Sequence, residues 1–495
     1  MKLSVEYQPN YVKLALPKGR FMLSTANLLQ EIALGFKDYN DKTRQYRLRS
    51  RRFPCLSAKI FQEKDIPTQV AIGNYDLGIC GSDWVEELLV RYPASALVRI
   101  SSLDYGEGSV YAAASHQAEI FCSVVSLAEK SNWHIVSEYP NLAQALALNL
   151  RMKTFKIFPV WGAAEVYPPD IADMAVLWAK NEDDIVAQGL VPLSELLPVT
   201  AMLIANREYF ENKDLSQILN CFSSKLTSCP TTHEGWYIER FPSLSPQACM
   251  PNKLNAQRKT VTSPSQWQTK EIKLALPDGH QQPPTQQFLK QTGLIFKGYT
   301  EKELNRRPFT DLDWLGIKVI RPQDMPLQVA NGNFDLAITG KDWLLEHLSR
   351  FPSSPVKELR DLGFGMVRIV AAVNQNMPVT NIDDLRALIQ SGKLTPLRVA
   401  SEYINISDKY LRDNYINPYK LIPTWGASEA FLPEDADLLI DNTQTGETLA
   451  QHNLKIIDVL FESTACLIGN KDSLDSHNKS ERIEFLVQLL SKGLS

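Results

Sequence analysis

The sequence has few cysteines, and they form no pattern that would hold a disulfide framework or a metal ion. Seven cysteines are scattered over 495 residues, without a Cys-x-x-Cys pair or a cysteine and histidine spacing typical of zinc sites. An odd number of widely spaced cysteines is typical of reduced thiols in a cytoplasmic protein. We therefore predict a cytoplasmic location and assign no metal ligands.

Long apolar runs and an excess of one charge are missing as well. No segment approaches the ~18 uncharged apolar residues needed to cross a bilayer, and residues 1–6 lack the apolar core of a secretory signal. The net charge is only −4, which is not the balance of a protein built around a nucleic-acid backbone. We expect neither a membrane nor a nucleic acid as a partner.

The chain is a tandem repeat of two long, similar segments. Five stretches of the first half return in the second half: 13–20 as 273–280, 65–67 as 324–326, 73–84 as 332–343, 137–139 as 401–403, and 161–163 as 425–427. The offset changes little along the chain and is far longer than a solenoid repeat. Two globular units of ordinary domain size are therefore predicted.

The repeat sets the expected domain boundaries. We predict copy A at residues 11–225, a linker at 226–270 that packs partly on one copy, and copy B at 271–495. Apolar runs that end in Pro or Gly alternate with helical stretches, so both copies are predicted to be α/β, with mainly parallel sheets. Asp83 and Asp342 follow such runs and are expected to cap the next helix.

The strongest chemical signal lies in copy B, at residues 436–449 (ADLLIDNTQTGETL). An apolar strand leads into an acid, a loop rich in hydroxyl groups, and a helix start. Backbone N–H groups and threonine hydroxyls of such a loop can bind one phosphate, and Gly446 can take a positive φ. Asp441 can accept hydrogen bonds from ribose hydroxyls. The alternative is a plain strand–helix turn capped by Thr445 or Thr448, which the other motifs make less favoured.

The motifs together resemble the catalytic region of the ATP phosphoribosyltransferase family, which performs the first step of histidine biosynthesis. The matching stretches are 16–20, 65–67, 76–83, 138–141, 361–368 and 441–449, which cover most of the chain outside the linker and ends. The resemblance implies an α/β fold in which each copy is two-lobed, like a type II periplasmic binding protein. It also implies the joining of N1 of ATP to C1 of phosphoribosyl pyrophosphate (PRPP), with Mg²⁺ and release of pyrophosphate.

The resemblance assigns site residues as well. The PRPP site falls on Asp441, Asn442, Thr443, Thr445, Gly446, Glu447, Thr448 and Leu449. Arg368 and Arg321 are the candidates for stabilising charge on the departing pyrophosphate. The ATP side is assigned to Lys18, Gly19, Arg20, Glu402 and Tyr403. The short form of the family works with a regulatory subunit resembling histidyl-tRNA synthetase, so such a subunit and a homo-oligomer are expected partners.

The two copies differ in complementary ways. Copy A has Leu177, Asn181, Glu182 and Asp184 in place of the acid, Gly and Thr residues of the loop, and it has Ser109 and Gln62 in place of Arg368 and Arg321. Copy B has Asp278 and His280 in place of Lys18 and Arg20. We therefore predict one composite site, in which copy B binds PRPP and copy A supplies cations.

Copy A would supply Lys18, Arg20 and one or two members of an arginine cluster, Arg44, Arg47, Arg49, Arg51 and Arg52. A weaker version keeps the whole site in copy B and leaves copy A as a scaffold. Two other functions stay open at this point: a phosphoribosyltransferase with another acceptor, and a non-catalytic regulatory relative.

Overall fold

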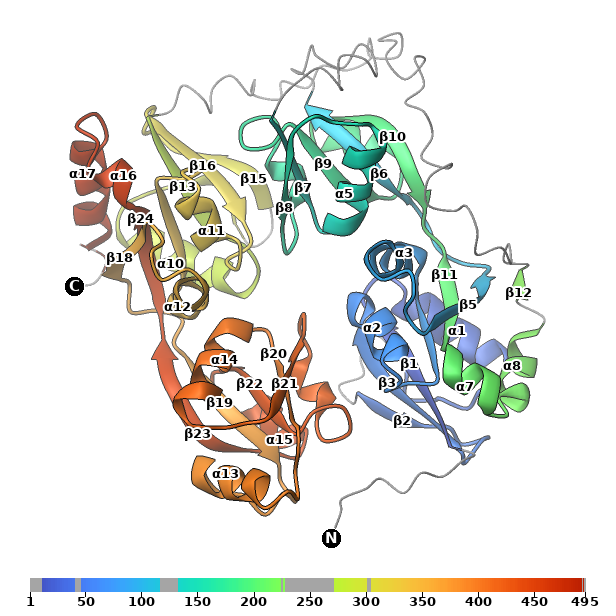
Figure 1. Cartoon of the computed structure of the whole chain (residues 1–495). Helices are drawn as coiled ribbons and strands as arrows, with labels where there is room; N and C mark the ends of the chain where they lie inside the picture. Colours follow the sequence, from blue (N-terminus) through green and yellow to red (C-terminus); the bar gives the residue numbers. More distant parts are fainter. Residues whose placement is uncertain are drawn as a thin grey trace.

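The chain folds into four α/β lobes, two from each copy. The computed structural model describes residues 11–40, 46–115, 132–223, 226–227, 271–300, 304–491 and 493. We name the lobes A1 (11–104 and 200–227), A2 (109–198), B1 (271–362 and 464–493) and B2 (367–463). They follow one another around a ring in the order A1, A2, B1, B2 (Figure 1). Among the described helices, none has the length and apolar character that crossing a bilayer requires.

Lobe A1 is built on a seven-stranded sheet with the order β12-β5-β11-β4-β1-β3-β2. Its strands are β1 (Val12–Lys18), β2 (Arg47–Arg49), β3 (Leu56–Gln62), β4 (Leu77–Gly81), β5 (Leu97–Leu103), β11 (Ala201–Asn206) and β12 (Leu226–Thr227). Its helices are α1 (Met22–Glu31), α2 (Ile66–Ala71), α3 (Ser82–Arg91), α7 (Arg207–Asn212) and α8 (Ser216–Phe222). Strand β12 lies inside the segment expected to be a linker and pairs with β5, and residues 228–270 lie outside the described part of the chain.

Lobe B1 repeats the core of this arrangement in a five-stranded sheet with the order β16-β13-β17-β24-β18. Its strands are β13 (Ile272–Pro277), β16 (Leu315–Ile320), β17 (Leu336–Gly340), β18 (Val356–Asp361) and β24 (Ala465–Asn470), beside a ribbon of β14 (Lys297–Tyr299) and β15 (Leu304–Phe309). Its helices are α10 (Gln282–Gln291), α11 (Met325–Ala330), α12 (Lys341–Arg350), α16 (Lys471–Leu474) and α17 (Ser480–Ser491).

Lobes A2 and B2 each hold a five-stranded sheet, with the equivalent orders β10-β6-β9-β7-β8 and β21-β20-β22-β19-β23 read from opposite edges. Lobe A2 contains β6 (Ser109–Ser115), β7 (Trp133–Ser137), α5 (Pro140–Asn149), β8 (Phe155–Pro159), β9 (Met174–Ala179), α6 (Glu182–Ala187) and β10 (Leu190–Pro198). Lobe B2 contains β19 (Val367–Asn374), α13 (Ile382–Gln390), β20 (Leu397–Ser401), α14 (Ile404–Asp413), β21 (Tyr419–Pro423), β22 (Leu438–Thr443), α15 (Glu447–Gln451) and β23 (Leu454–Ser463).

The sheets are mixed, so the prediction of mainly parallel sheets was wrong. Strand β1 is parallel to β3 and β4, but β11 is antiparallel to both β4 and β5. The reason is the two-lobed path of the chain. It leaves the first lobe after β5, builds the second lobe, and returns through β11 in the opposite direction; β24 does the same in copy B.

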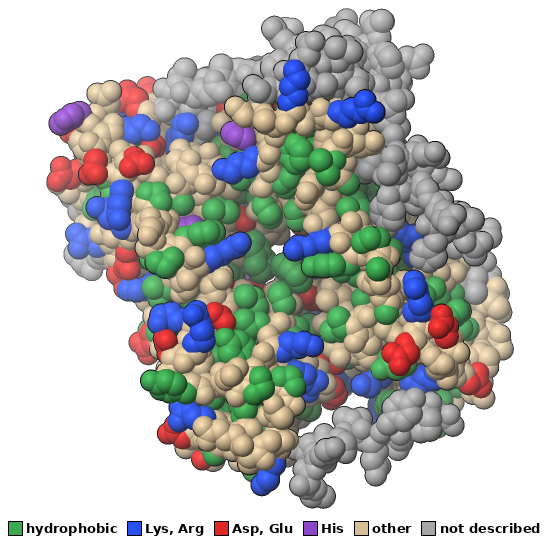
Figure 2. All heavy atoms as spheres, in the orientation of Figure 1, with side chains coloured by type: hydrophobic (Ala, Val, Ile, Leu, Met, Phe, Trp, Pro, Cys, Tyr) green, Lys and Arg blue, Asp and Glu red, His purple; other side chains and the backbone are tan. Residues whose placement is uncertain are grey.

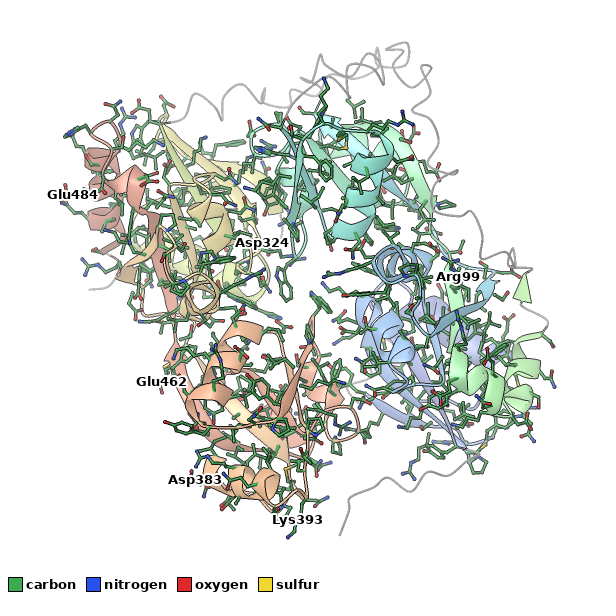
Figure 3. The ribbon with its side chains drawn as sticks, in the orientation of Figure 1. Arg99, Asp324, Asp383, Lys393, Glu462 and Glu484 are labelled. Atoms are coloured by element: carbon green, nitrogen blue, oxygen red, sulfur yellow. The ribbon has the colours of Figure 1, made fainter. Side chains whose placement is uncertain are left out.

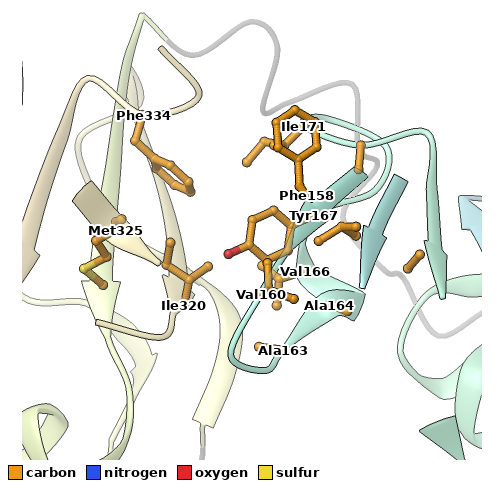
Figure 4. Packing of buried hydrophobic residues seen from close by; sticks show 14 of the residues in the cluster. Phe158, Val160, Ala163, Ala164, Val166, Tyr167, Ile171, Ile320, Met325 and Phe334 are labelled. Atoms are coloured by element: carbon orange, nitrogen blue, oxygen red, sulfur yellow. The ribbon is translucent and has the colours of Figure 1, made fainter. Parts of the chain in front are cut away.

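The two copies pack head to tail. One apolar core joins A2 to B1 and includes Tyr167 and Ile320 (Figure 4). A second core joins A1 to B2 and includes Phe61 and Phe431, whose rings lie 5.2 Å apart. Lobe A1 therefore packs against lobe B2, and lobe A2 packs against lobe B1, which is the arrangement that a composite site requires.

Candidate functional site

Residues 441–449, here called the phosphate loop, run from the end of β22 into the start of α15 in lobe B2. The N–H of Gly446 donates to the hydroxyl of Thr443 at 3.0 Å, and the N–H of Glu447 donates to the hydroxyl of Thr445 at 3.3 Å. Gly446 has φ +83° and occupies the N-cap position of α15. The positive φ expected for Gly446 is confirmed, and the alternative in which Thr445 or Thr448 is the N-cap was wrong.

A hydrogen-bond chain ties this loop to lobe B1. The amide of Asn442 donates to the Tyr403 hydroxyl at 2.9 Å, and that hydroxyl donates to Asp342 at 2.6 Å. The Ser463 hydroxyl donates to the other oxygen of Asp342 at 2.7 Å. Asp342 therefore positions the loop through Tyr403. The prediction that it caps α12 was wrong, because the N-cap of that helix is Gly340.

Carboxyl groups surround the start of the phosphate loop. Burial raises the pKa of Asp441 to about 7, and the nearby Glu429 carboxylate adds to the rise. Burial likewise raises the pKa of Glu402 to about 8, with a further contribution from Asp441. These two carboxyls therefore bind protons more readily than ordinary surface carboxyls.

Arg368 lies beside the phosphate loop. On β19 it faces Thr443 on one neighbouring strand and Glu462 on the other. The Arg368 side chain is half-buried, and no carboxylate in the described part of the chain forms an ion pair with it. Its guanidinium is therefore available to phosphate oxygens at the loop.

Copy A has the same framework without this chemistry. Ser109 pairs with Ala179 and Pro198 in the register that Arg368 has with Thr443 and Glu462, which confirms the expected equivalence. Leu177 takes the place of Asp441 and is buried. Asn181 caps α6 by accepting from the N–H of Asp184 at 2.9 Å. The copy A loop is thus an ordinary capped helix start with three acidic residues in its first turn.

Lys18 and Arg20 face different partners. The Lys18 ammonium donates to the Tyr46 hydroxyl at 3.1 Å, and the Tyr46 ring stacks on His452 of lobe B2 at 4.9 Å. Arg20 instead pairs with Glu63 at 2.9 Å and with Asp83 at 2.6 Å, both in lobe A1. Of the two, only Lys18 is directed toward copy B. Between them, Gly19 makes the turn with φ +100°.

Asp83 is the copy A equivalent of Asp342, and it is not a helix cap either. Its carboxylate accepts from Arg20 and from the Tyr139 hydroxyl, and Gly81 is the N-cap of α3. Tyr139 thus takes the place of Tyr403, and in copy A the Arg20 guanidinium replaces the Ser463 hydroxyl as the second donor to this aspartate.

The remaining predicted cations are spread over the contacts between copies. Arg321 pairs with Asp278 at 3.3 Å and lies against Gly162 of lobe A2, so the structure does not bring it to the phosphate loop. In the arginine cluster, Arg47 reaches copy B by pairing with Glu434 at 3.0 Å. The other described members, Arg49, Arg51 and Arg52, are exposed, and Arg44 lies outside the described residues.

Sequence reasoning missed the ion pairs that hold the copies together. Lys59 pairs with Asp435 at 2.7 Å, and its repeat equivalent Lys318 pairs with Asp170 at 2.8 Å. All four side chains are buried. A lysine in the same place of both apolar strands, 56–62 and 315–320, was the signal available in the sequence.

Comparison with known proteins identifies relatives of both copies. A family model described as ATP phosphoribosyltransferase matches residues 62–226 and 321–492, one segment in each copy. The ATP phosphoribosyltransferase of Prosthecochloris aestuarii is 35% identical over 228 residues, which cover 45% of this chain and 71% of the relative. That of Saccharolobus solfataricus is 34% identical over 229 residues, covering 45% of this chain and 72% of the relative.

A solved ATP phosphoribosyl transferase (HisG:HisZ) complex from Thermotoga maritima aligns with a TM-score of 0.36 and 24% identity. The alignment covers 45% of this chain and 98% of that chain. The two sequence relatives, with 228 and 229 aligned residues, thus align over a length close to that of one copy.

Proposed function

Since the chain belongs to the ATP phosphoribosyltransferase family, we propose that it joins N1 of ATP to C1 of PRPP at a single site built on the phosphate loop of copy B. The observation that carries the proposal is the contrast at one position of the two sheets. Copy B has Arg368 beside Thr443 of the loop, whereas copy A has Ser109 beside Ala179. An arginine and the loop hydroxyls suited to PRPP thus lie together in copy B and not in copy A.

The reaction requires the protein mainly to position the two substrates and to stabilise the charge that develops. As pyrophosphate leaves, C1 of the ribose becomes oxocarbenium-like, and adenine N1 attacks without losing a proton. The Asp441 carboxylate accepts hydrogen bonds from the ribose hydroxyls. The threonine hydroxyls and the Gly446 backbone of the loop bind the 5′-phosphate, and Arg368 stabilises charge on the leaving group.

Mg²⁺ fits this site as an ion carried with the substrate. The described residues hold no group of three metal-binding side chains. Mg²⁺ in phosphate sites commonly uses one or two carboxylates together with substrate oxygens. Asp441 and Glu447 are the loop carboxylates that would hold it, and when bound it would neutralise charge on the diphosphate.

Copy A completes the site in this proposal. Lys18 donates to Tyr46, whose ring stacks on His452, the residue that follows α15 and the phosphate loop. A regulatory subunit resembling histidyl-tRNA synthetase is a further prediction. It would be detected by a rise in turnover when such a subunit is added.

The test is pyrophosphate release by the full chain with PRPP, Mg²⁺ and ATP. Asp441→Asn removes the ribose acceptor and should abolish ATP-dependent release, whereas Asp184→Asn at the copy A loop should leave it unchanged. Binding of PRPP without release would favour another acceptor or a missing subunit. If the chain neither binds PRPP nor releases pyrophosphate, the proposal fails and a non-catalytic regulatory relative remains.

A further inference from the structure

Two neighbouring positions carry a cation and a glutamine in opposite order in the two copies. Copy A has Gln62 and Lys64, whereas the repeat equivalents in copy B are Arg321 and Gln323. Gln62 ends β3 and Arg321 directly follows β16, and in both copies the pair precedes the Asp-x-Pro motif. The exchange moves the positive charge by two residues and raises the question of what each cation faces.

The Lys64 ammonium lies among tryptophans and carboxyl groups from all four lobes. Its nitrogen is 5.2 Å from the ring centres of both Trp161 and Trp425. The charges that act on it come from Glu138, Asp65, Glu402 and Asp324. Figure 2 shows a hollow in the middle of this face of the molecule, bordered by hydrophobic side chains and by Lys or Arg side chains.

The Arg321 guanidinium is held in an ion pair, whereas the Lys64 ammonium forms none with a described carboxylate. Arg321 forms an ion pair with Asp278. Lys64 pairs with no described carboxylate, although burial lowers its pKa and the surrounding acids raise it. Since desolvation acts most strongly, an incoming anion would stabilise the charged form of Lys64.

The A1–B2 contact beside Lys64 also lacks, among the described residues, a hydrogen bond that is present at the equivalent place of the A2–B1 contact. On the other side, the N–H of Trp161 donates to both oxygens of Asp324, at 3.2 and 3.1 Å; Figure 3 shows Asp324 on lobe B1 toward lobe A2. The equivalent acid, Asp65, has a buried oxygen without a hydrogen-bond partner among the described residues. Trp425, which is equivalent to Trp161, stays 36% exposed.

A short chain of charges connects Lys64 to the phosphate loop. Among charged groups, Asp441 has the largest effect on the pKa of Glu402, and Lys64 has the next largest. Gln62 lies against Gly426, whose α-carbon region also approaches Glu402. Lys64 is therefore one side chain away from the start of the loop, on the side that lobe A1 presents.

We propose that Lys64 is a cation that copy A contributes to the substrate site of copy B, where it binds a phosphate group of an anionic substrate. It supplies the charge that Gln62 lacks in comparison with Arg321. The inference rests on the proposed function for the identity of the substrates, since the diphosphate of PRPP and the triphosphate of ATP offer the same chemistry. Kinetics with each substrate distinguishes these two sources.

The experiment compares Lys64→Gln, which copies Gln323, with Gln323→Lys as the matched change in copy B and Lys64→Arg as the conservative variant. Lys64→Gln should raise KM for one of the two substrates by about tenfold or more, as expected when a charged hydrogen bond to phosphate is lost. Lys64→Arg should keep KM within about threefold of wild type. Gln323→Lys should leave both KM values unchanged.

Direct titration of the full chain with PRPP and with ATP separates this inference from the proposed function. If Asp441→Asn abolishes turnover while Lys64→Gln changes neither KM nor affinity, the inference is overturned and the function stands. A lower melting temperature with unchanged affinity would likewise make Lys64 a structural counter-ion. If wild type releases no pyrophosphate, weaker PRPP or ATP binding by Lys64→Gln still supports the inference, and equal or absent binding overturns it.

Discussion

Lobe A1 contacts lobe B2, and lobe A2 contacts lobe B1. The two contacts have the same kind of buried ion pair, but they differ in the cations that stay outside ion pairs. Both are centred on a buried lysine–aspartate pair, Lys59 with Asp435 and Lys318 with Asp170. In the A2–B1 contact other cations are paired as well, as in Arg306 with Glu165 of lobe A2 at 3.3 Å. In the A1–B2 contact, Lys18 and Lys64 stay outside ion pairs among the described residues and border the phosphate loop. The comparison separates charges that assemble the copies from charges that remain for a ligand.

The buried pairs give the largest expected effect. Lys59→Met leaves the Asp435 carboxylate with the Tyr75 hydroxyl, and loss of one partner of a buried pair costs about 3–5 kcal/mol. Lys318→Met should cost less, because Arg307 still pairs with Asp170 at 2.9 Å. Calorimetric melting of both variants checks the order. Equal losses would mean that Arg307 does not take over, and Lys59→Met with Asp435→Leu should recover much of the loss.

Turnover should distinguish the two sheets at the matched positions 368 and 109. Arg368→Ser gives copy B the residue of copy A and should lower kcat by about 10²–10³, the usual cost of one charge-stabilising donor. Ser109→Ala removes a hydroxyl that donates to Glu195 at 2.6 Å and should leave kcat unchanged. Both rates come from the pyrophosphate assay. An unchanged kcat in Arg368→Ser would show that this arginine does not stabilise the leaving group.

The carboxyl groups around the phosphate loop should make PRPP binding depend on pH. Only the ionised Asp441 accepts ribose hydroxyls, so affinity should rise with pH through the pKa of about 7 and be about tenfold weaker at pH 6 than at its plateau. Glu429→Gln removes a neighbouring negative charge, lowers the pKa of Asp441 and should move the midpoint to lower pH. Because PRPP itself is the same in both titrations, the difference between wild type and variant reports on the protein. An identical midpoint would contradict the role of Glu429.

The features that could be predicted from the sequence are those that the repeat and the local motifs determine. The strands, the phosphate loop and the equivalence of Arg368 and Ser109 follow from patterns within one copy, and the register confirms that equivalence. The partners of Arg20, Arg321 and Lys64 could not be predicted, because they depend on how one lobe packs against another. Lys64 appears in the sequence only as one polar residue in a short polar run, and the tryptophans beside it come from distant segments.

The helix starts after β9 and β22 provide the smallest contrast, and they test whether the phosphate loop is more than a turn. Asn181→Ala removes the cap of α6 and should cost about 1 kcal/mol of stability without changing turnover. Gly446→Ala should cost a similar 1–2 kcal/mol, roughly, because an L residue at φ +83° is strained. A Cβ at Gly446 would meet no atom closer than 3.9 Å, so overlap adds nothing to that cost. If Gly446 serves only as a turn, the two variants will match in melting temperature and in turnover. If its backbone approaches phosphate, Gly446→Ala alone will raise KM for PRPP.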